Sequence, residues 1–112
     1  MSEPWPTEIR LGANGLELKL QFDNGEAVAM SAELLRVESP SAEVKGHGPG
    51  QEVLVLGKQN VRIQRIEPVG TYAVRLVFDD GHSTGIFTWA YLLKLGRGKN
   101  ELLATYRSKT AT

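Results

Sequence analysis

The chain is predicted to adopt an α+β fold with two layers, built from a mainly antiparallel sheet and two short helices. Two segments, LELKLQFDNG at 16–25 and YAVRLVFDDG at 72–81, alternate apolar and polar residues and end in a tight-turn sequence. Alternation with period two is typical of a half-buried antiparallel strand. The second segment repeats the first about 56 residues later. Each copy is followed by a return strand and a short apolar stretch, so a repeated β-hairpin–helix unit is expected.

Local signals predict where the elements of the first copy begin and end. Pro4 and Pro6 hold the N-terminus extended, because proline restricts φ at its own position and the conformation of its predecessor. Ser31 is a suitable N-cap for a short helix. The expected elements are a strand at 7–11, a turn at 13–15, a strand at 16–22, a type I′ turn at Asn24-Gly25, a return strand at 26–30 and a helix at 32–37 that ends near Ser39-Pro40.

The second half follows a loop at 39–51 that is rich in glycine and proline. Thr88 can cap the second helix, with Gly96 as its left-handed stop. The expected elements are a strand at 52–56, a turn at 57–60, a strand starting at 61, a turn at 68–70, a strand at 72–78, a type I′ turn at Asp80-Gly81, a return strand at 84–87, a helix at 89–95 and a weak helix at 101–106.

Composition narrows the possible class of protein. The 112 residues suit one domain, 1–112, with an ordered core at about 6–106 and a flexible tail at 107–112. Thirteen basic and thirteen acidic residues cancel, so the net charge predicts neither a nucleic-acid nor a membrane partner. Without cysteine, the chain alone cannot build a disulfide or a thiolate metal site. A signal peptide and a membrane-spanning run are both missing, and a cytoplasmic location is expected.

The second hairpin carries the candidate functional residues. If Asp80-Gly81 is a two-residue loop, Asp79 and His82 face each other across the strands, about 5 Å apart at Cβ. The first copy has Glu26 where the second has His82, so folding does not require the histidine. The candidate binding residues on this outer face are Arg75, Asp79, Asp80, His82 and Thr84, and His47 could join them if the 39–51 loop folds over the turn.

Three interpretations of this constellation remain open. Asp79 and His82 could form a structural cross-strand pair, the mixed charges could bind a ligand or partner, or His82 could bind a metal together with Asp79 or Asp80. Catalysis by this chain is not expected, and no catalytic residue or cofactor is predicted. The nucleophile-elbow, P-loop, dinucleotide-binding and zinc-protease motifs do not occur in the sequence. Asp79 and Asp80 are adjacent at a wet turn, which does not separate two carboxylate pKa values.

The segment EPVGTYAVRLVFDDGHSTGIFTWAYLLKL at 67–95, with LLRVESPSAEVKGHGPG before it, resembles the gamma-butyrobetaine hydroxylase-like N-terminal domain. The resemblance covers about residues 6–106, and FDDGH-x-x-G-I-F-x-W is its most specific part. It implies an α+β module that occurs alone in bacteria, ahead of iron- and 2-oxoglutarate-dependent oxygenases, or joined to P-loop ATPases of the Fe–S carrier type. The oxygenase domain with its iron ligands is absent from this chain, so hydroxylase activity is not expected.

The resemblance also implies a zinc site in the oxygenases, built from three cysteines and one histidine. The cysteine positions fall on Ser39, Ser41 and Val44, and the histidine position is His82. A zinc site is therefore not expected in this chain. The sequence favours a non-catalytic accessory or protein-interaction module, serving an Fe–S or oxygenase system in trans. The alternative is a metal- or small-ligand-binding protein centred on residues 79–82. Another protein is the expected partner, and an unpaired edge strand could also pair two copies of the chain.

Overall fold

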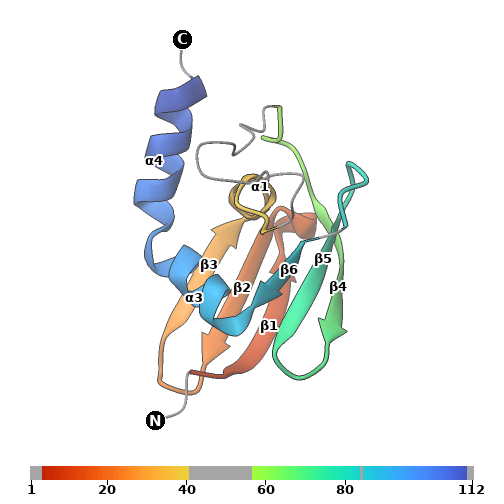
Figure 1. The fold of residues 1–112 in the computed structure, drawn as a ribbon, viewed down its shortest axis with the longest axis vertical. Helices are drawn as coiled ribbons and strands as arrows, with labels where there is room; N and C mark the ends of the chain where they lie inside the picture. The colour runs from red at the N-terminus through yellow and green to blue at the C-terminus, as the bar shows by residue number, and fades with distance from the viewer. Residues whose placement is uncertain (1–3, 41–56, 84, 111–112) are drawn as a thin grey trace.

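The computed structural model describes residues 4–40, 57–83 and 85–110 (Figure 1). Within them the chain forms six strands, one short 3-10 turn and three α-helices. In chain order these are β1 (Pro6–Gly12), η1 (Ala13–Gly15), β2 (Glu17–Phe22), β3 (Ala27–Ser31), α1 (Ala32–Val37), β4 (Ile63–Val69), β5 (Ala73–Phe78), β6 (Ile86–Thr88), α3 (Trp89–Arg97) and α4 (Lys99–Thr110). The strand expected at 52–56 lies outside the described residues.

The strands form two antiparallel sheets of three strands each, in the orders β1-β2-β3 and β4-β5-β6. The α+β class is confirmed, but two small sheets replace the one that the strand pattern suggested. Each sheet is a simple meander, and its apolar face needs a covering layer to be stable. One cluster of buried apolar side chains joins both sheets with α1 and α3. The core is therefore shared between the two halves of the chain.

The repeat extends further than the hairpin alone. Each half has an additional first strand, and the pairing of that strand with the next one is irregular at equivalent places, between Pro6 and Glu8 in one half and between Ile63 and Arg65 in the other. Both helices begin with the same cap: the Ser31 hydroxyl accepts the Leu34 N–H, and the Thr88 hydroxyl accepts the Tyr91 N–H. Each half is thus three strands and a helix, with matching registers.

The two hairpin turns differ from the predicted type I′ turns. In each turn only the glycine has a positive φ, 91° at Gly25 and 92° at Gly81. The N–H of Gly81 donates to the Phe78 carbonyl at 3.2 Å, and the Phe78 N–H donates to the His82 carbonyl at 2.9 Å. This is a three-residue loop, in which a type I turn is followed by a left-handed glycine. Phe78, and not Asp79, therefore lies opposite His82.

Two further predictions of element ends were wrong. Pro68 does not turn the chain but pairs with Val74 inside β4. An edge strand tolerates proline because one side of it needs no hydrogen-bond donor. Gly96 does not end the second helix, which runs on to Arg97 with Gly98 as its C-cap at φ −104°. Gly96 serves close packing instead, because a Cβ there would lie 2.5 Å from Cβ of Val28 on β3.

The last helix is longer than the sequence suggested. α4 runs from Lys99 to Thr110, whereas a weak helix was expected only over 101–106. It extends past the strands at the opposite end of the molecule from the N-terminus (Figure 1). Among the described residues, none of the helices is both long and apolar enough to cross a membrane.

The close contact of Gly96 with Val28 gives a test of this packing. The substitution Gly96→Ala should destabilise the protein by about 1–3 kcal/mol, because the added methyl overpacks the contact with β3. Helix propensity alone would change stability by about 1 kcal/mol in the opposite direction. Gly98→Ala is the matched control, since the nearest atom to its Cβ would lie 3.6 Å away. Urea unfolding of both variants makes the comparison, and equal stability of the two would contradict the proposed contact.

Candidate functional site

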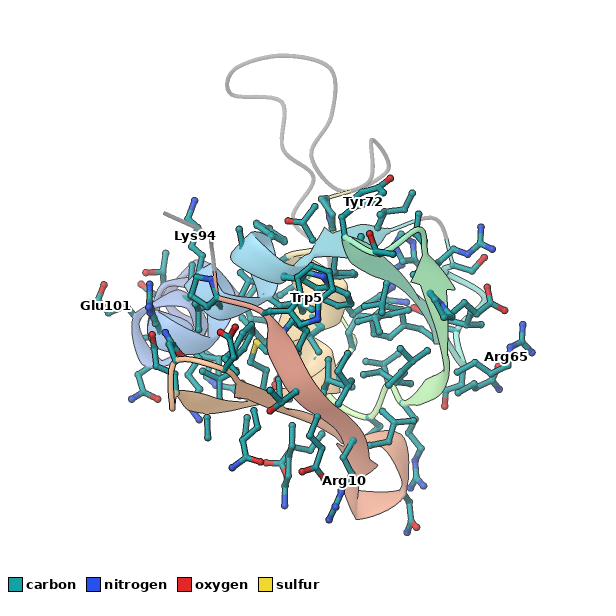
Figure 2. The ribbon with its side chains drawn as sticks, turned by 90° about the horizontal axis from the view of Figure 1, so that it is seen from below. Trp5, Arg10, Arg65, Tyr72, Lys94 and Glu101 are labelled. Carbon is teal, nitrogen blue, oxygen red and sulfur yellow. The ribbon has the colours of Figure 1, made fainter. Side chains whose placement is uncertain are left out.

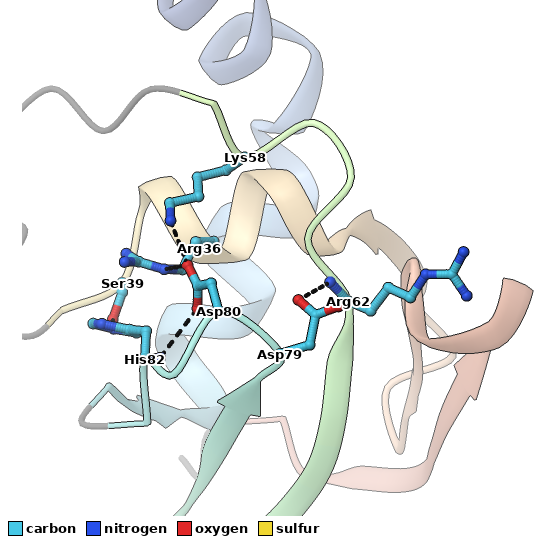
Figure 3. A network of polar contacts seen from close by, with 7 residues as sticks. All are labelled: Arg36, Ser39, Lys58, Arg62, Asp79, Asp80 and His82. Atoms are coloured by element: carbon cyan, nitrogen blue, oxygen red, sulfur yellow. Dashed lines mark hydrogen bonds and ion pairs between the residues drawn. The ribbon is translucent and has the colours of Figure 1, made fainter.

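Asp79 fastens the second turn to the segment before β4. Its carboxylate accepts the Arg62 N–H at 3.0 Å, and its own N–H donates to the Arg62 carbonyl at 2.9 Å (Figure 3). The first half has the same arrangement, because Asp23 accepts the Trp5 N–H at 3.0 Å and donates to the Trp5 carbonyl at 2.8 Å. The aspartate shared by both copies is therefore part of the fold and not a signature of ligand binding.

Asp80 lies at the centre of the polar network. Its Oδ2 is 2.8 Å from Nε of Arg36 at the end of α1 and 2.6 Å from Nζ of Lys58. Its Oδ1 accepts the His82 N–H at 3.0 Å. The backbone at the tip of the turn is open to solvent, but the Asp80 side chain is only 17% exposed and that of Arg36 only 6%. Two cations and one backbone donor thus surround this carboxylate (Figure 3).

These contacts determine the protonation state of Asp80. Burial by itself raises the pKa of Asp80, but hydrogen bonds from Lys58, from the His82 backbone N–H and from Arg36 outweigh it. The pKa consequently falls to about 2 from an ordinary value of 3.8. Asp80 is an anion over the whole neutral range, and its charge is neutralised within the protein.

His82 points into the molecule. The residue is 5% exposed, its ring centre lies 5.9 Å from that of Phe78, and its Nε2 is hydrogen-bonded to the fully buried Ser39 hydroxyl at 2.9 Å. Gly85 leaves the space that this pair needs, because a Cβ at that position would come within 2.1 Å of the Ser39 oxygen. The histidine and the serine therefore connect the second hairpin to the end of α1.

The first turn keeps the same local geometry with different partners. The Asn24 side chain accepts the Glu26 N–H at 2.9 Å, as Asp80 accepts that of His82. Short polar side chains commonly stabilise turns in this way. Glu26 then pairs with Arg97 of α3, and the hydrogen bond from this guanidinium lowers the pKa of the Glu26 carboxyl. The turn of each half is therefore paired with an arginine from the helix of the other half.

The structure separates the residues that were expected on one outer face. Asp79 and His82 do not form the predicted cross-strand pair, since the loop has three residues and His82 lies opposite Phe78. Arg75 is exposed and pairs with Glu67, 3.0 Å away. Thr84 and His47 lie outside the described residues, as does most of the 39–51 loop. Only Asp80 and His82 remain together, and they do so through the His82 backbone N–H and not through the ring.

Sequence reasoning missed the partners Arg36, Lys58 and Arg62. Arg36 lies on a helix more than forty residues from the turn, and no local pattern joins the two. One signal was available for Ser39, because the family resemblance places Ser39 and His82 in a single site. The structure brings these two side chains within 2.9 Å of each other.

The residues present do not fit the zinc site that the resemblance implies. Zinc in structural sites requires thiolates or imidazoles, and position 39 carries a neutral hydroxyl that is already hydrogen-bonded to His82. The charges of Arg36 and Lys58 beside Asp80 also oppose the binding of a cation. Over the residues that the structure describes, no three histidines, cysteines or carboxylates are grouped so as to hold a metal ion.

The Ser39–His82 pair does not resemble a catalytic dyad in its surroundings. A nucleophilic serine must reach a substrate, but Ser39 is 0% exposed. The Asp80 carboxylate binds the His82 backbone and the two cations, as described above, which is not how a triad aspartate orients an imidazole. The arrangement therefore stabilises the junction of hairpin and helix.

Comparison with known proteins identifies the class to which this fold and network belong. The family model described as gamma-butyrobetaine hydroxylase-like, N-terminal, matches residues 9–93. This match covers both repeats, including the turn at 79–82 and the helix caps. The chain belongs to the gamma-butyrobetaine hydroxylase-like N-terminal family. Comparison with proteins of curated function gave no match.

Solved structures of similar proteins agree with this membership. A crystal structure of a protein of unknown function from the DUF971 family of Acidithiobacillus ferrooxidans is 39% identical, with 85% of this chain and 98% of that chain covered and a TM-score of 0.70. Two proteins solved by NMR in solution are 43% and 46% identical, with TM-scores of 0.84 and 0.77. Each match covers 99% of this chain, and 87% and 86% of the respective relative. The first of these relatives is itself described as a protein of unknown function.

The substitution Asp80→Asn tests the charge at the turn, because Asn24 shows that an amide can keep the turn hydrogen bond. It should lower the free energy of unfolding at pH 7 by about 1–2 kcal/mol, less than the full pKa shift implies because the site is partly solvated. The folded-state pKa lies below the unfolded value, so this contribution is complete above about pH 4 and disappears as the pH falls towards 2. Urea unfolding across this range should show the two proteins converging, and a constant difference would contradict the charge effect.

A zinc titration tests whether His82 and its neighbours can bind a metal ion. One equivalent of Zn²⁺ should leave the His82 ring resonances unshifted in NMR spectra, because the imidazole is buried against Ser39 and flanked by cations. The other histidine, His47, serves as an internal reference, and spectra in a chelator should show the same fold. A stoichiometric shift of the His82 ring that is lost in chelator would establish a metal site instead.

Proposed function

We propose that this protein is a non-catalytic accessory module that acts by binding another protein. The polar groups of the second turn do not carry this proposal, because Asp79, Asp80 and His82 are engaged in contacts within the fold. The observation that carries the proposal is a set of aromatic side chains, Trp5, Tyr72 and Trp89, here called the aromatic end.

The aromatic end combines side chains from both halves. Trp5 is 49% exposed and Tyr72 is 55% exposed. The rings of Trp5 and Trp89 meet edge to face with centres 6.2 Å apart, and Nε1 of Trp89 donates to the Thr71 carbonyl at 2.9 Å. Trp89 is thereby held rigid, and Trp5 rests on it. Figure 2, which looks at this end from below, shows Trp5 and Tyr72 on the same side of the molecule.

Exposed aromatic side chains of this kind favour a protein partner. Tryptophan and tyrosine contribute large contact areas at a low cost in side-chain entropy, and they are enriched among the residues that dominate binding energies. The balanced net charge agrees with the prediction that the partner is neither nucleic acid nor a membrane.

The family setting indicates which partners to test first. The family resemblance implies that domains of this kind are joined to Fe–S carrier ATPases or to iron- and 2-oxoglutarate-dependent oxygenases, so this chain could serve such proteins in trans. A second copy of this chain is the other candidate, since β1, β3, β4 and β6 are the outer strands of the two described sheets.

Binding to a purified Fe–S carrier ATPase and to a purified oxygenase, each from the cell that makes this protein, can be measured by calorimetry. Tyr72→Ala should weaken binding to the true partner by tenfold or more, as expected for a loss of about 1.4 kcal/mol or more at an aromatic anchor. Ile86→Ala is the matched control, because Ile86 is 42% exposed on the outer face of β6 and should leave affinity unchanged. An equal loss in both variants would count against the aromatic end, and no binding to either protein would count against these two partners.

A further inference from the structure

We propose that the outer face of the first sheet binds a small organic anion through its carboxylate or phosphate oxygens. The face in question is a groove across β1, β2 and β3 that the start of α4 borders. It is separate from the second turn and from the aromatic end, and its anion ligand does not depend on the protein partner proposed above. Two features carry the inference: cations from three elements that line one groove, and an alanine at the position where the other half of the molecule has isoleucine.

The groove has a size suited to a small ligand. Its volume is about 480 Å³, and its lining includes the small side chains Ala27 and Ala29 together with Lys19 and Lys99. Pockets for small molecules in proteins usually measure about 300–1,000 Å³. Long polar side chains border the alanines, so a ligand would meet an apolar floor and a charged rim.

The charge in the groove is unbalanced. Arg10, Lys19 and Lys99 line it together with a single carboxylate, that of Glu8. Arg10 lies directly opposite Lys19 in the strand register, and Lys19 lies directly opposite Ala29. Like charges facing each other across strands are destabilising, so this row has a cost that a bound anion would remove. The Glu8 carboxylate pairs with Arg10, and the Glu17 carboxylate lies 3.6 Å from Nζ of Lys19. Both carboxylates are exposed to solvent, so they offset the positive charge of the groove only in part.

Lys99 adds a cation from outside the sheet. Its Nζ donates to the Ala29 carbonyl at 2.8 Å, which holds the ammonium at the edge of the groove. A lysine ammonium has three N–H donors, so this bond leaves capacity for a ligand oxygen. Among the described carboxylates, none forms an ion pair with Lys99.

The second half of the molecule shows that folding does not require this arrangement. The equivalent row there is Glu67, Arg75 and Ile86, again in direct register across three strands. Glu67 pairs with both Arg75, at 3.0 Å, and Arg65, at 3.3 Å, so two arginines share one carboxylate, and Ile86 stands where the first half has Ala29. The second face therefore has a larger side chain at this position, whereas in the first half Ala29 leaves the groove open and Lys99 adds a cation beside it. This difference points to a ligand.

The test uses the full chain labelled with ¹⁵N, titrated with succinate and separately with inorganic phosphate at constant ionic strength. Saturable shifts of the amides of Lys19, Ala27, Ala29 and Lys99 are expected with at least one probe. Saturation with succinate would assign a carboxylate ligand, and saturation with phosphate would assign a phosphate ligand.

Two pairs of variants make the assignment specific. Lys19→Gln should weaken binding roughly tenfold, as expected for the loss of one charge-assisted hydrogen bond, whereas Arg75→Gln at the equivalent position should leave it unchanged. Ala29→Ile copies the side chain that the second half carries and should abolish the saturable shifts, whereas Ile86→Ala should not. An unchanged amide pattern elsewhere shows that each variant is folded.

Three outcomes would overturn the proposal. Shifts that grow linearly with both probes would show only general ion effects. Equal weakening in Lys19→Gln and Arg75→Gln would show that overall charge, and not the groove, attracts the anion. Undiminished binding in Ala29→Ile would show that the hollow is not the site.

Discussion

The shared apolar core joins the two halves of the chain, and the ion pair between Arg36 and Asp80 is a polar contact across their junction. Arg36 lies in the last turn of α1 in the first half, and Asp80 lies in the turn of the second half. Its counterpart is the pair of Arg97 and Glu26, in which the second helix reaches the first turn. The helix of each half thus forms an ion pair with the hairpin turn of the other half. Strands and a helix from each half contribute to one core, so each half buries its apolar face against the other.

Buried contacts reinforce each of these two junctions. α3 approaches β3 so closely that only glycine fits at position 96 against Val28. At the other junction, the hydrogen-bonded pair of Ser39 and His82 occupies the space that the missing Cβ of Gly85 leaves. The histidine that distinguishes the second copy therefore belongs to the junction between the halves. The two surfaces that we propose for binding, the aromatic end and the outer face of the first sheet, lie away from this junction.

The starts of the two helices were predicted correctly, because a helix cap depends only on residues next to it in the sequence. Ser31 and Thr88 were identified as helix caps from residue type and position, and the structure confirms both. The role of Gly96 could not be seen in the same way. A glycine near the end of a helix favours a left-handed stop, but here a strand distant in the chain requires the absence of a Cβ. The predicted turn type was wrong for a related reason, since Asp-Gly suits both two-residue and three-residue loops. The length of the loop decides which residues of the two strands lie opposite each other, and one residue more moves this register by one position.

The sequence by itself determined the α+β class, the repeat, the helix caps and the position of the second turn, because alternation, capping and turn chemistry act over a few residues. Only the tertiary structure decided what that turn does. One residue more in the loop moves His82 from the solvent face to the interior, and the side chains that then meet it and Asp80 come from α1 and from Lys58. Such long-range partners are chosen by the packing of one half on the other, which no local pattern records.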